Sequence, residues 1–476
     1  MEDSPQMIDL GEFRESNRQA LESIAQDLER AGVHFAQVQI PFFSGVIRTK
    51  LAPIGEALGL QGEGLNTAAY GLTHGDGEPD GDVLFDGPTV GSNQGWPNIT
   101  AMADPTTVAQ LPWHPDTAAV LIHTFALDGS VCGLDVRALL RRVEERAAAL
   151  GFETKVAFEY EAFVYEVDDE AIRSGRIADL TPYGRHLAVY DGGRAPGFED
   201  FCRVFMSRMD ALGASVVAVH TEYGYGMIEF ALEPLPALKA ADAAVRAKLV
   251  LSELCEERGL VVTFMARSRP MGGESAAGAH LHQSLLRDGE NAFYSPEGDG
   301  LSEVARHYLA GILATLPELH LIYRPTVNSY RRFDRTAWSP DDASWGYENR
   351  YCAMRAITQP APHGVRFENR VAGADVNPYL AIAASVGAGL WGIEEQLKPP
   401  EPVIDDPLRT DRFPPLPRRL PESIEAFEKS KLAPALFGSE LTNHYVASRQ
   451  AEWDAFSHWL DNRITEFEYL RYFESR

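Results

Sequence analysis

Residues 155–167 read KVAFEYEAFVYEV, and this stretch carries the strongest strand signal of the chain. Apolar and polar positions alternate in it, as in a β-strand whose side chains at i and i+2 share one face. Glu159 and Glu161 therefore face the same way. Two carboxylates on one face repel each other unless a cation lies between them. The spacing predicts either a metal-binding strand or a solvated strand face with alternating glutamates.

A second acidic pair occurs in HTEYGYGMIEF, residues 220–230. Glu222 and Glu229 flank a turn that contains Gly224 and Gly226. A glycine-rich turn can bring its two ends together over one site. The alternative is a hairpin with two surface acids.

Histidines repeat with strand spacing in SAAGAHLHQSLL, residues 275–286. His280 and His282 are two apart, and the small residues before them allow a ligand to approach the backbone. The alternative is a pair of histidines that make ordinary polar contacts within a folded strand.

The stretch GVRFENRVAGADVNPYLA, residues 364–381, places Arg366, Glu368 and Arg370 on one strand face. Such a pattern is either a surface ion-pair ladder or two anion-binding groups beside a metal ligand. The four motifs together supply five carboxylates and one imidazole with the chemistry of hard-metal ligands. The chain contains neither GxxxxGK[ST] nor a GxGxxG that follows a strand, so neither a P-loop nor a dinucleotide-binding fold is indicated.

Composition sets limits on partners and location. The chain has 476 residues with 43 Lys and Arg against 69 Asp and Glu, a formal net charge of −26. This charge argues against nucleic acid and anionic lipid as partners. Four scattered cysteines without a CxxC and an N-terminus without a signal-peptide pattern predict a reduced, cytoplasmic protein. The longest apolar run, about 379–393, is too short for a membrane span and predicts a buried helix.

The order of the motifs resembles the glutamine synthetase superfamily, from about Asp104 to the C-terminus. The matching segments are FEYEAF, the glutamates at 222–229, GAHLHQSL at 278–285, and NSYRR…ENR…R…RFENR…NPYLA at 328–381. The resemblance implies an α+β, glutamine synthetase-like fold. It has an N-terminal β-grasp domain, placed at 1–115, and a catalytic domain with a curved antiparallel sheet and helices, placed at 116–476. It also implies a homo-oligomer, a dodecamer of two hexameric rings with active sites between neighbouring subunits.

Site residues follow from the resemblance position by position. It implies two or three Mg²⁺ or Mn²⁺ ions per active site, with ATP as a substrate. One metal site would use Glu161, Glu222 and Glu229, and the other Glu159, His280 and Glu368. Arg332 and Arg370 match arginines that hold glutamate, and Arg350 and Arg355 match arginines that contact the phosphates, Arg350 also stabilising the transferred phosphoryl group. His282 and Ser284 fall where the family contacts ATP.

The chain departs from the family directly after NSYRR. Members that use ammonia carry R-x-x-P-G-[YF]-E-A-P there, whereas this chain reads RFDRTAWSP from Arg332. The flap glutamate that helps to deprotonate ammonium is replaced by Trp338, which offers an aromatic face instead. We therefore place Trp338 with Arg332 and Arg350 among the residues that act in catalysis.

Smaller departures lie elsewhere in the matching segments. Ser275 and Ala276 stand where the family has Asn-Gly, beside the α-amino or carboxylate region of the substrate. Asp86, in FDGPT, matches the ammonium-site aspartate of FDGSS, but its spacing to Trp96 is longer than in the family.

These departures resemble the γ-glutamylamide synthetase branch. The implied reaction joins the γ-carboxylate of L-glutamate to an organic amine through γ-glutamyl phosphate, with ADP and phosphate as further products. An acidic pocket favours a polyamine. An apolar pocket, walled by Trp338 with Trp345 or Tyr347, favours an alkylamine or arylamine. The alternatives are an ammonia-using glutamine synthetase and a non-catalytic scaffold of the same fold.

Overall fold

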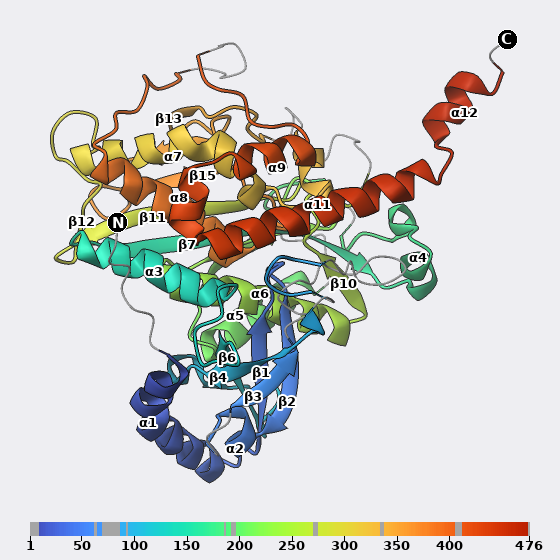
Figure 1. Cartoon of the computed structure of the whole chain (residues 1–476). Helices are drawn as coiled ribbons and strands as arrows, with labels where there is room; N and C mark the ends of the chain where they lie inside the picture. Colours follow the sequence, from blue (N-terminus) through green and yellow to red (C-terminus); the bar gives the residue numbers. More distant parts are fainter. Residues whose placement is uncertain are drawn as a thin grey trace.

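The structure is a computed structural model built around two sheets (Figure 1). It describes residues 9–60, 64–68, 86–91, 94–184, 187–191, 197–269, 275–333, 338–404 and 412–474. The smaller sheet is formed by the N-terminal part of the chain, and the larger sheet by the part that carries the four motifs. The α+β fold class expected from the sequence is confirmed.

The smaller sheet has the strand order β2-β1-β6-β4-β3, with β5 paired to β6. Its strands are β1 (Phe35–Pro41), β2 (Ile47–Pro53), β3 (Leu65–Ala68), β4 (Asn98–Ala103), β5 (Ala109–Gln110) and β6 (Thr117–Phe125). β1 and β6 are parallel, and the other pairs are antiparallel. β6 follows the predicted domain boundary at 115/116, so this sheet continues past that position to Phe125.

The larger sheet has the order β13-β14-β15-β11-β7-β9-β8, with β10 paired to β7 and β12 to β11. Its strands are β7 (Glu153–Glu166), β8 (Val216–Thr221), β9 (Met227–Leu232), β10 (Leu260–Thr263), β11 (Ala279–Arg287), β12 (Glu290–Asn291), β13 (Trp345–Tyr347), β14 (Met354–Ile357) and β15 (Arg366–Asn369). β13 and β14 are parallel, and the remaining pairs are antiparallel. All four motifs therefore lie on or beside strands of one sheet.

The helices are α1 (Leu10–Arg30), α2 (Ile54–Ala57), α3 (Val136–Ala149), α4 (Asp169–Arg173), α5 (Phe198–Ala211), α6 (Ala237–Glu257), α7 (Glu303–Tyr323), α8 (Pro378–Glu394), α9 (Leu420–Glu428), α10 (Leu432–Phe437), α11 (Ser439–Asp461) and α12 (Glu466–Tyr472). Three 3₁₀ turns are η3 (Pro105–Thr107), η4 (Ile177–Asp179) and η5 (Asn328–Arg332). Several of the helices, α1, α3, α4, α7, α8 and α12, begin directly after a residue whose side chain caps the N-terminus. α8 illustrates this, because Asn377 caps its N-terminus ahead of Pro378.

One face of the larger sheet is apolar and carries the core. Helices α7 and α8 cover it (Figure 1). Tyr308 of α7 stacks on Phe367 of β15 with ring centroids 6.5 Å apart, and its hydroxyl donates to Gln283 of β11 at 2.6 Å. Because side chains alternate along a strand, Glu368 and the histidines of β11 project from the opposite face.

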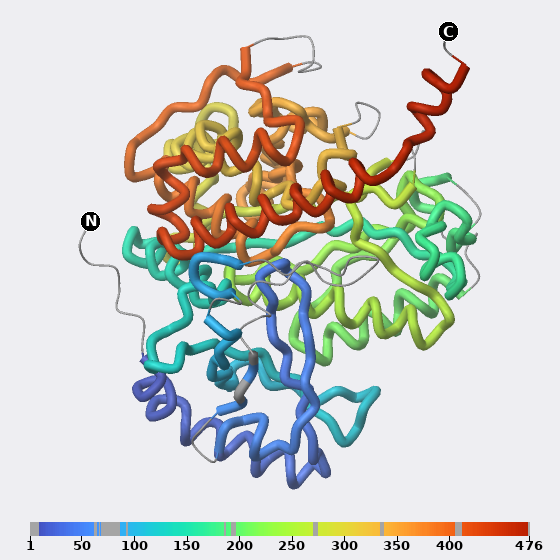
Figure 2. The backbone as a smooth tube through the Cα atoms, turned by 45° about the vertical axis from the view of Figure 1, so that its right-hand side comes forward, coloured from blue at the N-terminus to red at the C-terminus, as the bar shows by residue number. Residues whose placement is uncertain are grey.

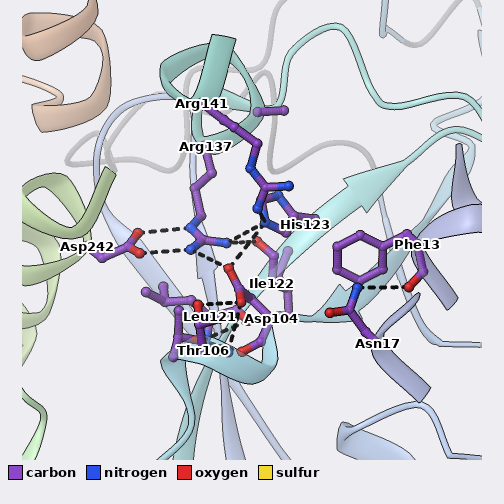
Figure 3. A network of polar contacts seen from close by, with 12 residues as sticks. Phe13, Asn17, Asp104, Thr106, Leu121, Ile122, His123, Arg137, Arg141 and Asp242 are labelled. Atoms are coloured by element: carbon purple, nitrogen blue, oxygen red, sulfur yellow. Dashed lines mark hydrogen bonds and ion pairs between the residues drawn. The ribbon is translucent and has the colours of Figure 1, made fainter. Parts of the chain in front are cut away.

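A buried polar network joins the smaller sheet to helices α3 and α6 (Figure 3). Arg137 of α3 binds both oxygens of Asp242 on α6, at 2.9 and 2.8 Å, and Asp104 at 3.0 Å. Arg137 and Arg141 both contact Nε2 of His123 on β6, at 3.0 and 2.9 Å. Arg137 is 1% exposed, so this joint is a fully desolvated set of ion pairs.

The structure also tests the helices predicted from sequence. The buried helix expected at about 379–393 is confirmed as α8. The amphipathic pattern of residues 136–150 and the pattern of 237–259, which ends at Gly259, also predict helices, and α3 and α6 confirm both. The Gly- and Asp-rich composition of residues 71–95 predicts a loop, most of which lies outside the described residues. Within the described ranges, no helix combines the length and apolarity needed to cross a bilayer.

Candidate active site

Functional side chains form rows across the polar face of the larger sheet. Glu161 on β7 is paired with Glu229 on β9, and Glu159 on β7 with His280 on β11. The carboxylates and imidazoles of neighbouring strands therefore share one side. The strand alternation expected from FEYEAF and GAHLHQ is the cause.

Glu159, His280 and Glu368 form the first cluster. Nδ1 of His280 lies 3.3 Å from Glu159 and 3.5 Å from Glu368. One ligand atom from each residue lies within 4.8 Å of the other two. The structure thus brings together the three residues that the sequence assigned to one metal site.

Glu368 is held ionised by its neighbours. It is 1% exposed, it accepts from Arg355 at 3.0 Å, and it also pairs with Arg370. Burial opposes ionisation, but the positive charge of Arg370 is the largest of the effects that outweigh it and lower the pKa of Glu368 to about 2. The carboxylate is therefore available as a ligand at neutral pH.

His220, Glu222 and Glu229 form the second cluster, with one ligand atom from each within 4.8 Å of the others. Glu161 accepts from the backbone N–H of Gly278 at 2.5 Å, on the strand next to Glu229. Burial, and then the charge of Glu229, raise the pKa of Glu161 to about 8. Burial likewise raises the pKa of Glu229 to about 7.

The two clusters fit divalent metal ions by the chemistry of their donors. Carboxylate oxygens suit Mg²⁺ and Mn²⁺, and imidazole nitrogen suits Mn²⁺. The raised pKa of Glu161 shows that the carboxylates repel each other and are buried without sufficient positive charge nearby. A divalent cation held by these residues would supply that charge.

Arg332 lies close to Glu161. It is buried, and its Nη1 donates to the carbonyls of Val371 at 3.0 Å and Ala372 at 2.5 Å. A Cβ at Gly278 would come within 2.8 Å of its Nη2 and 3.2 Å of Glu161. The missing side chain at Gly278 is therefore what allows Arg332 to approach this glutamate.

His282 lies beside the first cluster in a defined tautomer. Arg366 donates to its Nδ1 at 3.1 Å, so Nε2 carries the hydrogen and donates to Glu159 at 3.2 Å. Ser284 follows two residues later on the same face of β11 and is buried. Both residues predicted to contact ATP thus border the cluster that contains Glu368.

The remaining predicted residues line the ends of the strands. The backbone N–H of Ser275 donates to the carbonyl of Tyr223 at 2.8 Å, and Ala276 beside it is buried. Arg350 is exposed, and its carbonyl accepts from Nε of Arg370 at 3.1 Å. Together they surround the polar face from two sides. Asp86 is exposed on the N-terminal part of the chain.

Trp338 forms an aromatic pair with Tyr351. The two ring centroids are 6.1 Å apart at an angle of 64°. Trp338 is 49% exposed and has a φ of 49°, an unusual value for a bulky side chain. Its partner Tyr351 directly follows Arg350 in the sequence.

The expectation that Trp345 or Tyr347 walls the amine pocket is wrong for Trp345. Its indole is 1% exposed and donates to the carbonyl of Pro400 at 2.7 Å. Packing against the segment that contains Pro400 directs the indole of Trp345 toward the core. The hydroxyl of Tyr347 is bound to Asp299 instead.

Two residues of the site were not singled out from sequence. His220 precedes Glu222 by two positions, so strand alternation was the signal that places it on the same face. Tyr190 lies over His220 with ring centroids 4.6 Å apart and is otherwise exposed. No sequence pattern pointed to Tyr190, because it comes from an irregular segment.

The comparisons with known proteins agree with this geometry. A family profile described as the glutamine synthetase catalytic domain matches residues 133–472. Gamma-glutamylethanolamide synthetase GlnA4 of Streptomyces coelicolor is 37% identical over 80% of each chain. Glutamate–isopropylamine ligase of a Pseudomonas species is 33% identical over 83% of this chain and 85% of its own.

More distant relatives show the same fold. The glutamine synthetase of Pyrococcus abyssi is 31% identical over 82% of this chain and 89% of its own. A solved structure of a GmaS/ADP complex superposes with a TM-score of 0.80 at 25% identity, covering 98% of this chain and 100% of the other. The chain belongs to the glutamine synthetase family.

Proposed function

We propose that this protein is an ATP-dependent ligase that joins the γ-carboxylate of L-glutamate to an organic amine. The main support for this proposal is Trp338, which occupies the position of the flap glutamate of ammonia-using members. Its ring pairs with that of Tyr351, the residue after Arg350. Two relatives, a gamma-glutamylethanolamide synthetase and a glutamate–isopropylamine ligase, support an organic acceptor.

The residues proposed as metal ligands come from β7, β9, β11 and β15 and, for Glu222, from the position directly after β8. Glu159, His280 and Glu368 would hold one ion, and Glu161, Glu222 and Glu229 another. Bound Mg²⁺ or Mn²⁺ supplies positive charge that balances a transferring phosphoryl group. Two or three ions per site are part of this proposal.

The arginines then have separate tasks. Arg332 and Arg370 orient glutamate, because guanidinium groups bind carboxylates in a defined geometry. Arg350 and Arg355 bind the phosphates, and the exposed side chain of Arg350 is free to swing toward the transferred phosphoryl group. His282 and Ser284 contact ATP along the edge of β11.

The reaction has two steps. A carboxylate is a poor acyl donor, because its leaving group would be oxide. In the first step an oxygen of the γ-carboxylate bonds to the γ-phosphorus of ATP, and ADP leaves. In the second step the neutral amine attacks the acyl carbon, the bond to phosphate breaks, and the nitrogen loses a proton. Arg350 stabilises the charge that develops on phosphate.

The acceptor pocket has an aromatic wall. Trp338 and Tyr351 are 49% and 41% exposed, so their rings are accessible to the alkyl part or the cationic form of an amine. Trp338 cannot remove a proton from the amine, unlike a glutamate at that position. An ammonium ion would therefore gain little at this wall.

We also propose a cytoplasmic homo-oligomer, a dodecamer of two hexameric rings with intersubunit active sites. The C-terminal arm α12 extends away from the body in both views (Figures 1 and 2). Its apolar side chains Phe467, Leu470 and Phe473 are 64%, 82% and 79% exposed. Such a surface is typical of a protein contact. The catalytic domain is proposed to follow β6, after Phe125.

The runner-up is an ordinary glutamine synthetase, favoured by the 31% identity to the Pyrococcus abyssi enzyme. The third alternative is a non-catalytic scaffold of the same fold. The presence of both clusters of glutamate and histidine side chains argues against it. One assay separates the three: ATP-dependent phosphate release with glutamate, a panel of amines and ammonia. Turnover with ammonia alone contradicts the proposal. No turnover with any acceptor supports the scaffold.

Two variants sharpen this assay. Glu161→Ala should abolish phosphate release. Trp338→Glu should raise the ammonia-dependent rate relative to the amine-dependent rate, because it restores a proton acceptor. Trp338→Phe is the matched control that keeps an aromatic ring. An unchanged ratio in Trp338→Glu would refute the role given to this residue.

A further inference from the structure

His220 on β8 lies within the second cluster but is not among the six ligands assigned above. Its Nε2 is 3.1 Å from Oε1 of Glu229, and its Nδ1 is 3.9 Å from Oε2 of Glu222. Cross-strand pairing of His220 with Glu229 puts both side chains on the polar face. The imidazole is therefore part of the acidic row that includes Glu161.

The orientation of this imidazole is defined by its backbone contact. Nδ1 lies 3.1 Å from the carbonyl oxygen of Thr221. A carbonyl only accepts, so Nδ1 carries a hydrogen and donates it. Nε2 is the nitrogen that faces the carboxylates. Metal-ligating histidines commonly use this arrangement, with one nitrogen on a carbonyl and the other on the ion.

The imidazole of His220 also packs against an aromatic side chain. Tyr190 packs against it with centroids 4.6 Å apart and an interplanar angle of 67°. The backbone of Tyr190 donates to the carbonyl of Thr221 at 3.0 Å, and that of Asp191 to the hydroxyl of Thr221 at 2.8 Å. These contacts keep His220 turned toward Glu229.

The separations match those of neighbouring ligands on one ion. Metal–ligand bonds of about 2.1 Å at right angles place two ligand atoms about 3 Å apart. The 3.1 Å between Nε2 of His220 and Glu229 has this size, and so do the 3.3 Å and 3.5 Å around His280. Both clusters then consist of two glutamates and one histidine.

We propose that Nε2 of His220 is a direct ligand of the metal ion that Glu222 and Glu229 hold. The inference rests on the proposed metal-dependent function and adds a ligand to one of its sites. An imidazole nitrogen favours Mn²⁺ over Mg²⁺. His220 therefore makes this site selective for Mn²⁺. The competing arrangement is an imidazolium that pairs with Glu229 and never binds the ion.

Pulsed electron paramagnetic resonance of bound Mn²⁺ tests the bond directly, because an imidazole nitrogen on the ion produces a nitrogen modulation. The wild type and a His280→Gln variant should both show it. His220→Gln should lower its amplitude, and the double variant should lose it. His34→Gln, at an exposed position ahead of β1, is the matched control. An unchanged amplitude in His220→Gln overturns the proposal.

Calorimetry provides the second readout. His220→Gln should weaken Mn²⁺ binding at one site by about tenfold or more, while Mg²⁺ binding changes much less. His220→Asp, which supplies an oxygen ligand, should shift the preference toward Mg²⁺. Equal losses for both metals, or none for either, contradict a direct bond. Neither measurement needs turnover, so a metal-bound protein inactive with every acceptor would refute the ligase and leave this inference standing.

Discussion

Glu161 on β7 and Glu229 on β9 are direct partners in adjacent antiparallel strands, so a buried and a half-buried carboxylate face the same side. Burial and the charge of Glu229 raise the pKa of Glu161 to about 8. Burial and the charges of Glu159 and Glu222 raise the pKa of Glu229 to about 7, from an ordinary value of 4.5. The pair is the part of the site that most needs a cation.

The stabilisation of the fold by a bound metal ion should therefore depend on pH. A carboxyl with a raised pKa stabilises the metal-free fold in full below its ordinary pKa, and this contribution is lost as the pH rises to the raised value. An ion binds the deprotonated pair. The shift in melting temperature caused by Mg²⁺ should accordingly grow between pH 6 and pH 8. Thermal denaturation with and without Mg²⁺ checks this, and a shift independent of pH would contradict it.

Gly278 should tolerate no side chain. A Cβ there would lie 2.8 Å from Arg332 and 2.9 Å from His280, closer than a Cβ approaches another atom in folded proteins, and 3.2 Å from Glu161, which is also tight. Gly278→Ala should therefore displace these groups and lower phosphate release by at least about 100-fold, as misplacement of reacting groups does. The melting temperature should change far less.

Gly55→Ala is the matched control for that variant. Gly55 lies in α2, and a Cβ there meets no atom within 4 Å. Its activity should equal that of the wild type. If Gly278→Ala retains full turnover, the close approach around Gly278 does not shape the site.

The buried joint of Arg137 should be a large contributor to stability (Figure 3). Arg137→Met leaves Asp242 and Asp104 buried without their charge partner, which costs about 3–5 kcal/mol. Urea denaturation monitored by circular dichroism should show this loss. Arg203→Met removes an exposed ion pair with Glu199 on α5 and should leave the midpoint within error. Equal midpoints for the two variants would show that the joint is not important for folding.

The C-terminal arm should control assembly. Replacing both Leu470 and Phe473 by Asp puts charges on side chains that are 82% and 79% exposed in the single chain. If these side chains pack in an oligomer, the variant should form a smaller species by light scattering after size exclusion. Arg471→Asp, on the same helix, is the control for added charge. An unchanged mass for the double variant would place the subunit contacts elsewhere.

The local sequence was sufficient to predict strand β7 and the types of side chain that could bind a metal ion. Alternation in FEYEAF predicted that Glu159 and Glu161 share a face, and β7 has that pattern. Strand alternation is a property of the extended backbone and needs no tertiary contact. The gathering of Glu159 with His280 was predicted by resemblance to a family. No local rule reaches across the 121 positions between them.

Other features depended on packing. Trp345 and Trp338 lie close in sequence and are both aromatic, yet one is 1% exposed and the other 49%. The difference comes from Pro400, whose carbonyl accepts from Trp345 and whose segment covers it. Burial of this kind is decided by residues far along the chain.

The sequence by itself therefore determined which side chains share a strand face and which chemistry they offer. The two-residue repeat of an extended backbone fixes the face, and the residue types fix the chemistry. The tertiary structure alone decided that Gly278 leaves room for Arg332 and that Trp345 is buried. Strand register and close packing place these atoms, and both arise from non-local burial of the apolar face.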